Sequence, residues 1–324
     1  MWFLRTEMRR REFLAISFIF FNSLGSALAE PSRVWRVALV SSGAVAETGA
    51  VFRRALQSFG YEEGKNLTID VREAKGRFAL LPDLVKQIVD LKPDVIVAVA
   101  TPAVAAAQTA TSSIPIVMSP ATDPIGSGFV KSFAHPGGNI TGIANMYGDL
   151  TAKTLEILHV VIPTAKKIGV LTSNNPTHPS LFEAAQRGAS AIGLSAERFT
   201  AADPDNLERA FMEMNSAKCD AVYVLADPYL PAMPAIALKV RLPAIYQVRL
   251  YVEDGGLMSY GPDALAMFAR AAYYVDRIIK GDNPAEIPVE QPTTFQFVVN
   301  LRTAKAIGLT IPESVLLQAD KVIE

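Results

Sequence analysis

The chain has 324 residues, half of them hydrophobic, and it carries 31 basic against 32 acidic side chains. This length suits two domains, and the high apolar content with a net charge near zero excludes a disordered chain. The charge balance also argues against a nucleic-acid-binding protein, which carries a basic excess on one face. A single cysteine, Cys219, excludes an intramolecular disulfide, and three scattered histidines argue against a histidine-based metal site.

The first 29 residues have the parts of a secretory signal peptide. A short basic start at 8–12 leads into the apolar run 13–21, and Ala27 and Ala29 are the small residues that a signal peptidase reads. The apolar run is shorter than the ~20 residues that cross a bilayer. We therefore expect cleavage after about Ala29 and export of a soluble protein. An arginine pair in the basic start leaves the general secretion and twin-arginine routes both open.

Short apolar runs alternate with amphipathic stretches in the first half of the mature chain, a pattern typical of β-α-β units around a parallel sheet. Continuous apolar runs, as in strands covered on both faces, predict strands at 34–40, 67–71, 95–100 and 114–118. Helical spacing predicts helices between them at 51–59, 80–91 and 102–110.

The second half repeats this order. Strands are predicted at 168–172, 196–199, 221–225 and 244–246, with helices at 180–192 and 204–217. Three segments recur at offsets of 126, 128 and 131 positions: 92–97 resembles 218–223, 113–116 resembles 241–244, and 36–41 resembles 167–172. The repeat predicts an α/β fold of two Rossmann-like lobes with parallel sheets, joined near 142–149.

The chain after residue 246 departs from the repeat. One strand is predicted at 255–261, a long helix at 263–279, a further strand at 295–299 and a short helix at 301–307 that ends at a glycine. These elements complete both sheets, so the chain crosses between the lobes more than once and forms a hinge. The predicted division is a first lobe of 33–145 plus 248–291 and a second lobe of 146–247 plus 292–324.

Residues for covalent or metal chemistry are not grouped in the sequence. Cys219 precedes a strand in an apolar setting and is interpreted as a buried small hydrophobe. His135 lies in a Pro- and Gly-rich turn. A nucleophile, a base and an orienting group cannot be assembled at the predicted strand ends, and no phosphate-binding or nucleophile-elbow motif is present. We expect no catalytic residue, no metal and no cofactor.

Polar residues follow nearly every predicted strand. In open parallel sheets, ligands bind outside the carboxyl ends of the strands, where loops enter helices. The residues predicted to bind a ligand are therefore Ser41, Ser42, Thr101, Ser119, Thr122, Asp123, Asn145, Asn174, Asp227, Tyr246 and Tyr260.

Thr101 and Asp227 occupy equivalent positions in the repeat, because the offset of 126 aligns one with the other. Thr101 precedes a proline as a helix N-cap does, which leaves backbone N–H groups for an anion. With Ser42 and Ser119 it is predicted to bind an anionic end of the ligand, such as a carboxylate. Asp227 would face it across a cleft as the partner of an ammonium group, a pairing that fits an amino acid. The alternative is that Asp227 only caps the following helix.

The sequence resembles the periplasmic substrate-binding proteins of ABC transporters, in the family that includes tryptophan and other aromatic amino-acid binders. The resemblance covers essentially all of 33–324. Its motifs include Gly60-Tyr61-x-Glu63-Gly64, Ala100-Thr101-Pro102-Ala103, Asp123-Pro124-Ile125-Gly126, Pro136-Gly137-Gly138-Asn139, Leu225-Ala226-Asp227-Pro228 and Asn300-Leu301-x-Thr303-Ala304. One departure is a shorter segment with two prolines between Asp227 and Arg241, which predicts a short or irregular helix there.

The resemblance implies a type I periplasmic-binding fold with a small-molecule ligand held between two lobes. It also implies a non-enzymatic protein that captures a small solute, such as an amino acid or a related carboxylate, and delivers it to a permease in the inner membrane. We expect a monomer. Two alternatives share the cleft: a sensory module for a receptor kinase, and an exported α/β enzyme.

Overall fold

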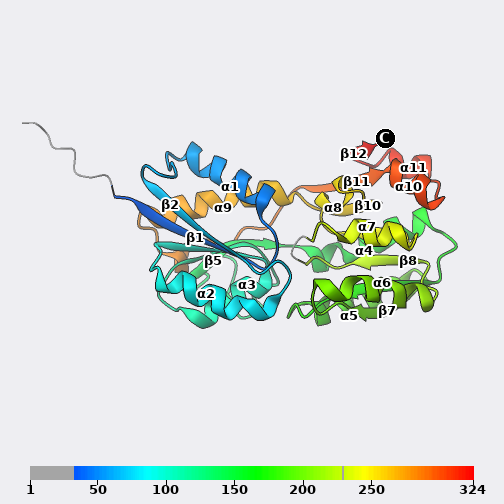
Figure 1. Ribbon diagram of the computed structural model, residues 1–324, viewed down its shortest axis with the longest axis horizontal. Coiled ribbons are helices and arrows are strands. Elements are labelled where there is room, and N and C mark those ends of the chain that lie inside the picture. Colours follow the sequence, from blue (N-terminus) through cyan, green and yellow to red (C-terminus); the bar gives the residue numbers. More distant parts are fainter. Residues whose placement is uncertain (1–32, 228–229) are drawn as a thin grey trace, which may run out of the picture. The chain divides into compact units, whose positions relative to one another are not determined.

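A computed structural model describes residues 33–227 and 230–324, so the predicted signal peptide lies outside the described residues. Residues 34–324 form one compact unit. The strands of this unit belong to two sheets, one of five strands and one of seven (Figure 1). The predicted α/β class with two parallel-sheet lobes is confirmed.

The first sheet has the order β2-β1-β3-β4-β5, and all its strands are parallel. Its strands are β1 (Trp35–Ser41), β2 (Leu67–Glu73), β3 (Val95–Val99), β4 (Ile116–Thr122) and β5 (Ile140–Asn145). The helices and 3-10 turn of the same part of the chain are α1 (Ala46–Ser58), η1 (Phe78–Leu80), α2 (Leu81–Asp90) and α3 (Thr101–Ala110).

Alternation along β1 explains how this sheet is covered on both faces. Val37 and Leu39 are buried in one cluster with residues of α1 and of the later helix α9 (Ala264–Ile279). Ala38 and Val40 are buried on the opposite face in a cluster with residues of α2 and α3. Because successive side chains of a strand point to opposite faces, each apolar run of the sequence supplies two cores.

The second sheet has the order β12-β11-β10-β9-β8-β6-β7, and β10 and β11 pair antiparallel in it. Its strands are β6 (Lys167–Thr172), β7 (Ser195–Thr200), β8 (Ala221–Val224), β9 (Ala244–Tyr246), β10 (Met258–Pro262), β11 (Phe295–Asn300) and β12 (Lys321–Ile323). The helices and turns of the remaining chain are α4 (Tyr147–Val161), α5 (His178–Ala191), η2 (Pro204–Asn206), α6 (Leu207–Ser216), α7 (Met233–Lys239), α8 (Leu250–Glu253), η3 (Pro284–Glu286), α10 (Leu301–Ile307) and α11 (Glu313–Leu316).

The predicted internal repeat is confirmed by the topology. The order β2-β1-β3-β4-β5 of the first sheet matches β7-β6-β8-β9-β10 of the second. The match extends to local hydrogen bonds: a carboxylate oxygen of Asp94 accepts the N–H of Arg36, and one of Asp220 accepts the N–H of Lys167. In each repeat an aspartate before the third strand therefore holds the start of the first strand.

Two features differ from the sequence prediction, and a third agrees with it. The strand β5 and the long helix α4 were not predicted, although the join between the halves was placed near them. The assignment of 248–291 to the first lobe is wrong for β10, because Met258 and Ser259 pair with β9 and the whole strand pairs with β11. α7 is short, as predicted from the prolines of that segment.

Within the described residues 33–227 and 230–324, the chain passes between the two sheets three times. The connections lie between β5 and α4, between β10 and α9, and between η3 and β11. After the second crossing, α9 packs against α1 and β4 of the first sheet (Figure 1). Three connections between two lobes are the arrangement of a hinge, about which the lobes can rotate.

Candidate functional site

The described residues surround a pocket at the carboxyl ends of both sheets, and about 660 Å³ of empty space, part of it open to solvent, lies within it. Residues that follow β1, β3, β5 and β8 line it, and so does the first part of α9. Parallel strands bring their carboxyl ends to one edge, and this edge is where open α/β sheets bind ligands.

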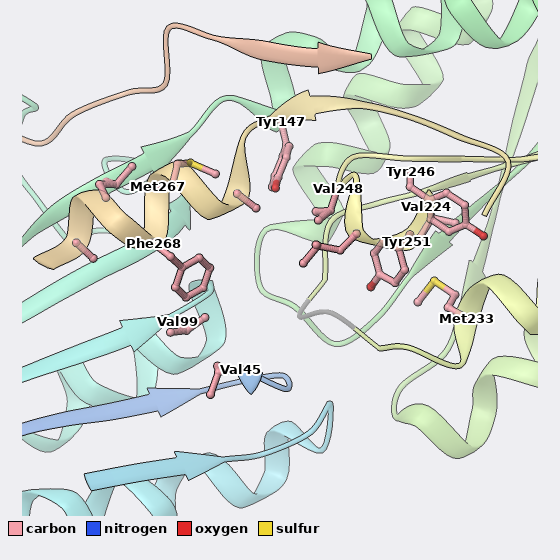
Figure 2. Close-up of a cluster of buried hydrophobic side chains, with 14 of the residues drawn as sticks. Val45, Val99, Tyr147, Val224, Met233, Tyr246, Val248, Tyr251, Met267 and Phe268 are labelled. Atoms are coloured by element: carbon pink, nitrogen blue, oxygen red, sulfur yellow. The ribbon is translucent and has the colours of Figure 1, made fainter. Parts of the chain in front are cut away.

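One side of the cavity is apolar. Met267 and Phe268 extend from α9, while Tyr147 and Val248 lie toward the second sheet (Figure 2). Leu250 adds a further aliphatic surface. Burial raises the pKa of the Tyr147 hydroxyl above its ordinary value, so this phenol stays neutral. This side of the cavity can take an aromatic or aliphatic group.

The first lobe contributes a set of neutral hydrogen-bonding side chains. The hydroxyl of Thr101 accepts the N–H of Thr122 at 3.0 Å, and the amide of Asn145 donates to the hydroxyl of Thr122 at 2.9 Å. Ser41 lies beside them at the end of β1. Thr48, in the first turn of α1, lines the cavity, and its buried hydroxyl has no hydrogen-bond partner among the described residues.

Thr101 is the first residue of α3 and not its N-cap, which corrects the sequence prediction. The N-cap is Ala100, whose φ of 68° and ψ of 155° place it in a region that is strained for a residue with a Cβ. No side chain caps α3. The hydroxyl of Thr101 instead anchors β4, and the strained turn at Ala100 brings the start of α3 to the cavity wall.

Asp227 follows β8 and is the charged residue among those that line the cavity. Its side chain is 13 % exposed. The amide of Asn175 donates to its Oδ1 at 3.3 Å, and Nε2 of His178 lies 3.6 Å from the same oxygen. The alternative that Asp227 caps the following helix is wrong, because α7 begins at Met233 with Ala232 as its N-cap.

The structure gathers five of the predicted binding residues around the cavity, namely Ser41, Thr101, Thr122, Asn145 and Asp227. Thr101 and Asp227 thus line the same cavity from the two lobes, as the repeat predicts. The other six are not among the residues that line it: Ser42, Ser119, Asp123, Asn174, Tyr246 and Tyr260.

The remaining predicted residues have other surroundings. Ser42 and Ser119 are fully buried. Asp123 is exposed and accepts the N–H of Gly126 in a turn. Tyr246 is buried in the core, where it stacks on Tyr251, and Tyr260 packs against Phe295 and Phe297. Asn174 is exposed, and its neighbour Asn175, in the loop after β6, lines the cavity instead.

Sequence reasoning missed the residues that helices bring to the cavity. Thr48 and Phe268 lie on the buried faces of α1 and α9. From the sequence alone, a residue on such a face is interpreted as part of the hydrophobic core. Asn175 was passed over for Asn174. The sequence signal for Asn175 was the Asn-Asn pair itself, from which only the packing of the loop selects one member.

The structure offers no nucleophile at Cys219. Burial raises the pKa of its thiol to about 11, so the thiol stays protonated near neutral pH. Within 33–227 and 230–324, no group of three or more His, Cys, Asp or Glu side chains is placed to hold a metal ion. No helix in this part of the chain is long and apolar enough to cross a membrane.

Comparison with known proteins identifies relatives along nearly the whole chain. A tyrosine-binding protein of Clostridioides difficile is 28 % identical over 275 residues, which cover 80 % of this chain and 75 % of that protein. A conserved domain protein of Vibrio cholerae is 30 % identical with a TM-score of 0.83, and it covers 90 % of this chain and 100 % of its own. The ABC domain in complex with L-Trp from Streptococcus pneumoniae is 27 % identical with a TM-score of 0.80 over the same shares.

The fold and the family follow from these matches. A leucine-binding protein of Thermotoga maritima, 15 % identical with a TM-score of 0.56 over 76 % of this chain and 83 % of its own, shares the fold, which is that of the type I periplasmic binding proteins. The profile of the ABC transporter substrate binding protein family matches residues 34–323. Two of these proteins, those of C. difficile and T. maritima, are named as binding proteins. With its cavity between two α/β lobes, the chain belongs to the ABC transporter substrate binding protein family.

Proposed function

We propose that the protein captures an α-amino acid with an aromatic side chain and delivers it, without chemical change, to the permease of an ABC importer. The observation that carries the proposal is the polarity of the cavity. One carboxylate, Asp227, lies opposite neutral donors of the first lobe, and an apolar wall with Phe268 and Tyr147 lies beside them. The relatives named for tyrosine and crystallised with L-Trp support the same ligand class.

The charges of the cavity set the orientation of the ligand. The ammonium group pairs with Asp227, because no Lys or Arg is among the residues that line this cavity and compete for its charge. The carboxylate contacts the neutral side, where Thr48 has a hydroxyl without a partner among the described residues and Thr101 begins α3. The aromatic ring lies against Phe268 and Met267.

Transport requires that the lobes close around the solute and open at the permease. Closure excludes water and strengthens the polar contacts of the ligand, and the three connections between the sheets allow it. The proposal includes export to the periplasm and action as a monomer. It also includes a role in binding and not in catalysis, which is supported by the buried thiol of Cys219 and by a cavity lining without Cys, His or Lys among the described residues.

The direct test is a thermal-shift screen followed by titration calorimetry with L-tryptophan, L-tyrosine, L-leucine and glucose. A bound amino acid is expected to raise the stability by about 2.7 kcal/mol at a hundred times its dissociation constant. Saturable binding of an aromatic amino acid supports the proposal. Glucose is the control, because a neutral sugar has no group for Asp227. Binding of glucose with no binding of any amino acid would contradict the proposed ligand class.

The variant Asp227→Asn tests the ammonium contact. It keeps the size of the side chain but removes the charge, which leaves the ammonium group of the ligand unpaired in a closed cavity. The affinity for the amino acid is expected to fall by roughly 2–5 kcal/mol, and the melting temperature of the ligand-free protein to change little. A lower melting temperature with unchanged affinity would remove Asp227 from the site.

A further inference from the structure

We infer that His178 is a positioning residue for the amino-group subsite: it holds the end of β8 so that Asp227 presents an unneutralised carboxylate to the cavity. This inference rests on the proposed function and adds to it a residue that does not touch the ligand. His178 is the first residue of α5, is fully buried and is not among the residues that line the cavity. Its imidazole lies directly behind Asp227.

Hydrogen bonds determine which ring nitrogen of His178 carries the proton. The backbone N–H of Ser173 donates to Nδ1 at 2.7 Å, and the hydroxyl of Ser173 lies 3.4 Å from the same nitrogen. Nδ1 is therefore the acceptor, and the proton of the neutral ring is on Nε2. The imidazole accordingly brings a donor, but no positive charge, to the region of Asp227.

The Nε2–H group of His178 points at the end of β8. It lies 3.3 Å from the carbonyl oxygen of Ala226 and 3.6 Å from Oδ1 of Asp227. The backbone N–H of Ala226 is held as well, since it donates to the side-chain oxygen of Gln247 at 2.6 Å. Both polar backbone groups of Ala226 are thus held by buried side chains, and this fixes the direction in which Asp227 leaves the strand.

The carboxylate itself is approached by neutral groups on one oxygen only. Asn175 and His178 both lie against Oδ1, whereas Oδ2 has no hydrogen bond or ion pair with any other described residue. The amide of Asn175 is fixed in turn, because its oxygen accepts the N–H and the hydroxyl of Thr177. Neutral donors orient Asp227 without cancelling its charge, so a cationic group on the ligand is needed to complete the site.

The test compares two ligands that differ only in the amino group: L-tryptophan and indole-3-propionate, or L-tyrosine and 3-(4-hydroxyphenyl)propionate. The variant His178→Asn keeps an acceptor for Ser173 but withdraws the donor from Ala226 and Asp227. We expect its affinity for the amino acid to fall roughly tenfold and its affinity for the deaminated analogue to stay within about twofold of wild type. His178→Gln, whose amide reaches the position of Nε2, is expected to recover part of the loss.

The matched control is Asn300→Ala. Asn300 is a buried residue of the same sheet whose side chain caps α10 by accepting the N–H of Thr303, and it does not line the cavity. Loss of the Asn300 side chain is expected to lower the melting temperature but to leave unchanged the ratio of the affinities for the amino acid and its deaminated analogue. An equal loss of affinity for both ligands in His178→Asn would overturn the positioning role and leave the proposed function in place. Failure of the wild-type protein to bind any aromatic amino acid would overturn both.

Discussion

The hydroxyl groups of the cavity differ in whether they already have a hydrogen-bond partner within the protein. Thr101 and Thr48 both line the cavity, but Thr101 accepts the N–H of Thr122, while Thr48 has no partner among the described residues. A hydrogen bond within the protein contributes to stability, whereas a buried hydroxyl without a partner lowers it until a ligand provides one. The hydroxyl of Thr101 is therefore expected to contribute to folding stability, and that of Thr48 to ligand binding.

The pair Thr48→Val and Thr101→Val tests this difference. Thr48→Val is expected to weaken ligand binding by roughly 1–2 kcal/mol, since a hydrogen bond to a charged carboxylate is lost, and to leave the stability of the ligand-free protein unchanged or slightly higher. Thr101→Val leaves the N–H of Thr122 unsatisfied and is expected to lower both stability and affinity. Calorimetric titration and urea unfolding of both variants give the answer; a loss of stability in Thr48→Val would show that its hydroxyl is already bound within the fold.

At the scale of elements, α9 joins the last third of the chain to the first sheet. Apolar residues at helical spacing predicted the helix, and its observed bounds are Ala264–Ile279. The packing adds a buried polar contact, in which the hydroxyl of Tyr61 donates to Oδ1 of Asp276 at 3.0 Å. Lys280 donates to the other oxygen of Asp276 at 2.8 Å. This contact specifies the register between α9 and the segment that follows α1.

Removal of the Tyr61 hydroxyl tests how much that contact contributes to the free energy of unfolding. Tyr61→Phe leaves the buried Asp276 with one donor fewer and is expected to cost about 1–3 kcal/mol of unfolding free energy near neutral pH. Tyr273→Phe, on the same helix but only partly buried, is the control and should cost less.

The same contact predicts a pH dependence. Burial, together with the hydrogen bond to Asp276, raises the pKa of Tyr61 from 10 to about 12. A raised pKa in the folded state means that the contribution is fully present below pH 10 and is lost as the pH rises through about 12. Urea unfolding at several alkaline pH values should therefore show the wild type approaching Tyr61→Phe. A constant difference up to pH 12 would contradict the contact.

At the scale of the whole 34–324 unit, the loop after β2 meets the second half of the repeat away from the three connections. The guanidinium of Arg77 donates to both carboxylate oxygens of Asp205, at 3.0 and 2.9 Å. Next to it, Gly76 lies so close to Pro204 that an added Cβ would come within 2.7 Å of its ring. Contacts of this kind exist only while the lobes are together, so they favour the closed state.

The ion pair is exposed, and its effect on closure is expected to be small. Arg77→Glu should weaken ligand binding by roughly 0.2–1 kcal/mol, since exposed pairs are screened by water and salt. The double variant Arg77→Glu/Asp205→Arg restores an ion pair of the opposite sense and should recover the affinity. Titration at low and high salt measures the effect, with Lys86→Glu, whose partner Asp90 is on the same helix, as the control. No recovery in the double variant would exclude a role for the pair in closure.

The sequence by itself determined the class of fold, most of the strands and helices, and the internal repeat. The apolar run 95–100 predicts a buried strand, observed as β3 at Val95–Val99, and the aspartates Asp94 and Asp220 mark the same local structure in both halves. Periodicity and turn residues act over a few positions, so a single sequence displays them. The same repeat brought Thr101 and Asp227 to one cavity.

Only the tertiary structure decided which residues form the cavity wall. The choice between Asn174 and Asn175, the contribution of Thr48 and Phe268 from helices, and the placement of β10 in the second sheet all depend on contacts between distant segments. The role of His178 depends on three such contacts, to Ser173, Ala226 and Asp227. The directions of side chains at strand ends are set by packing between elements, and local sequence carries no record of that packing.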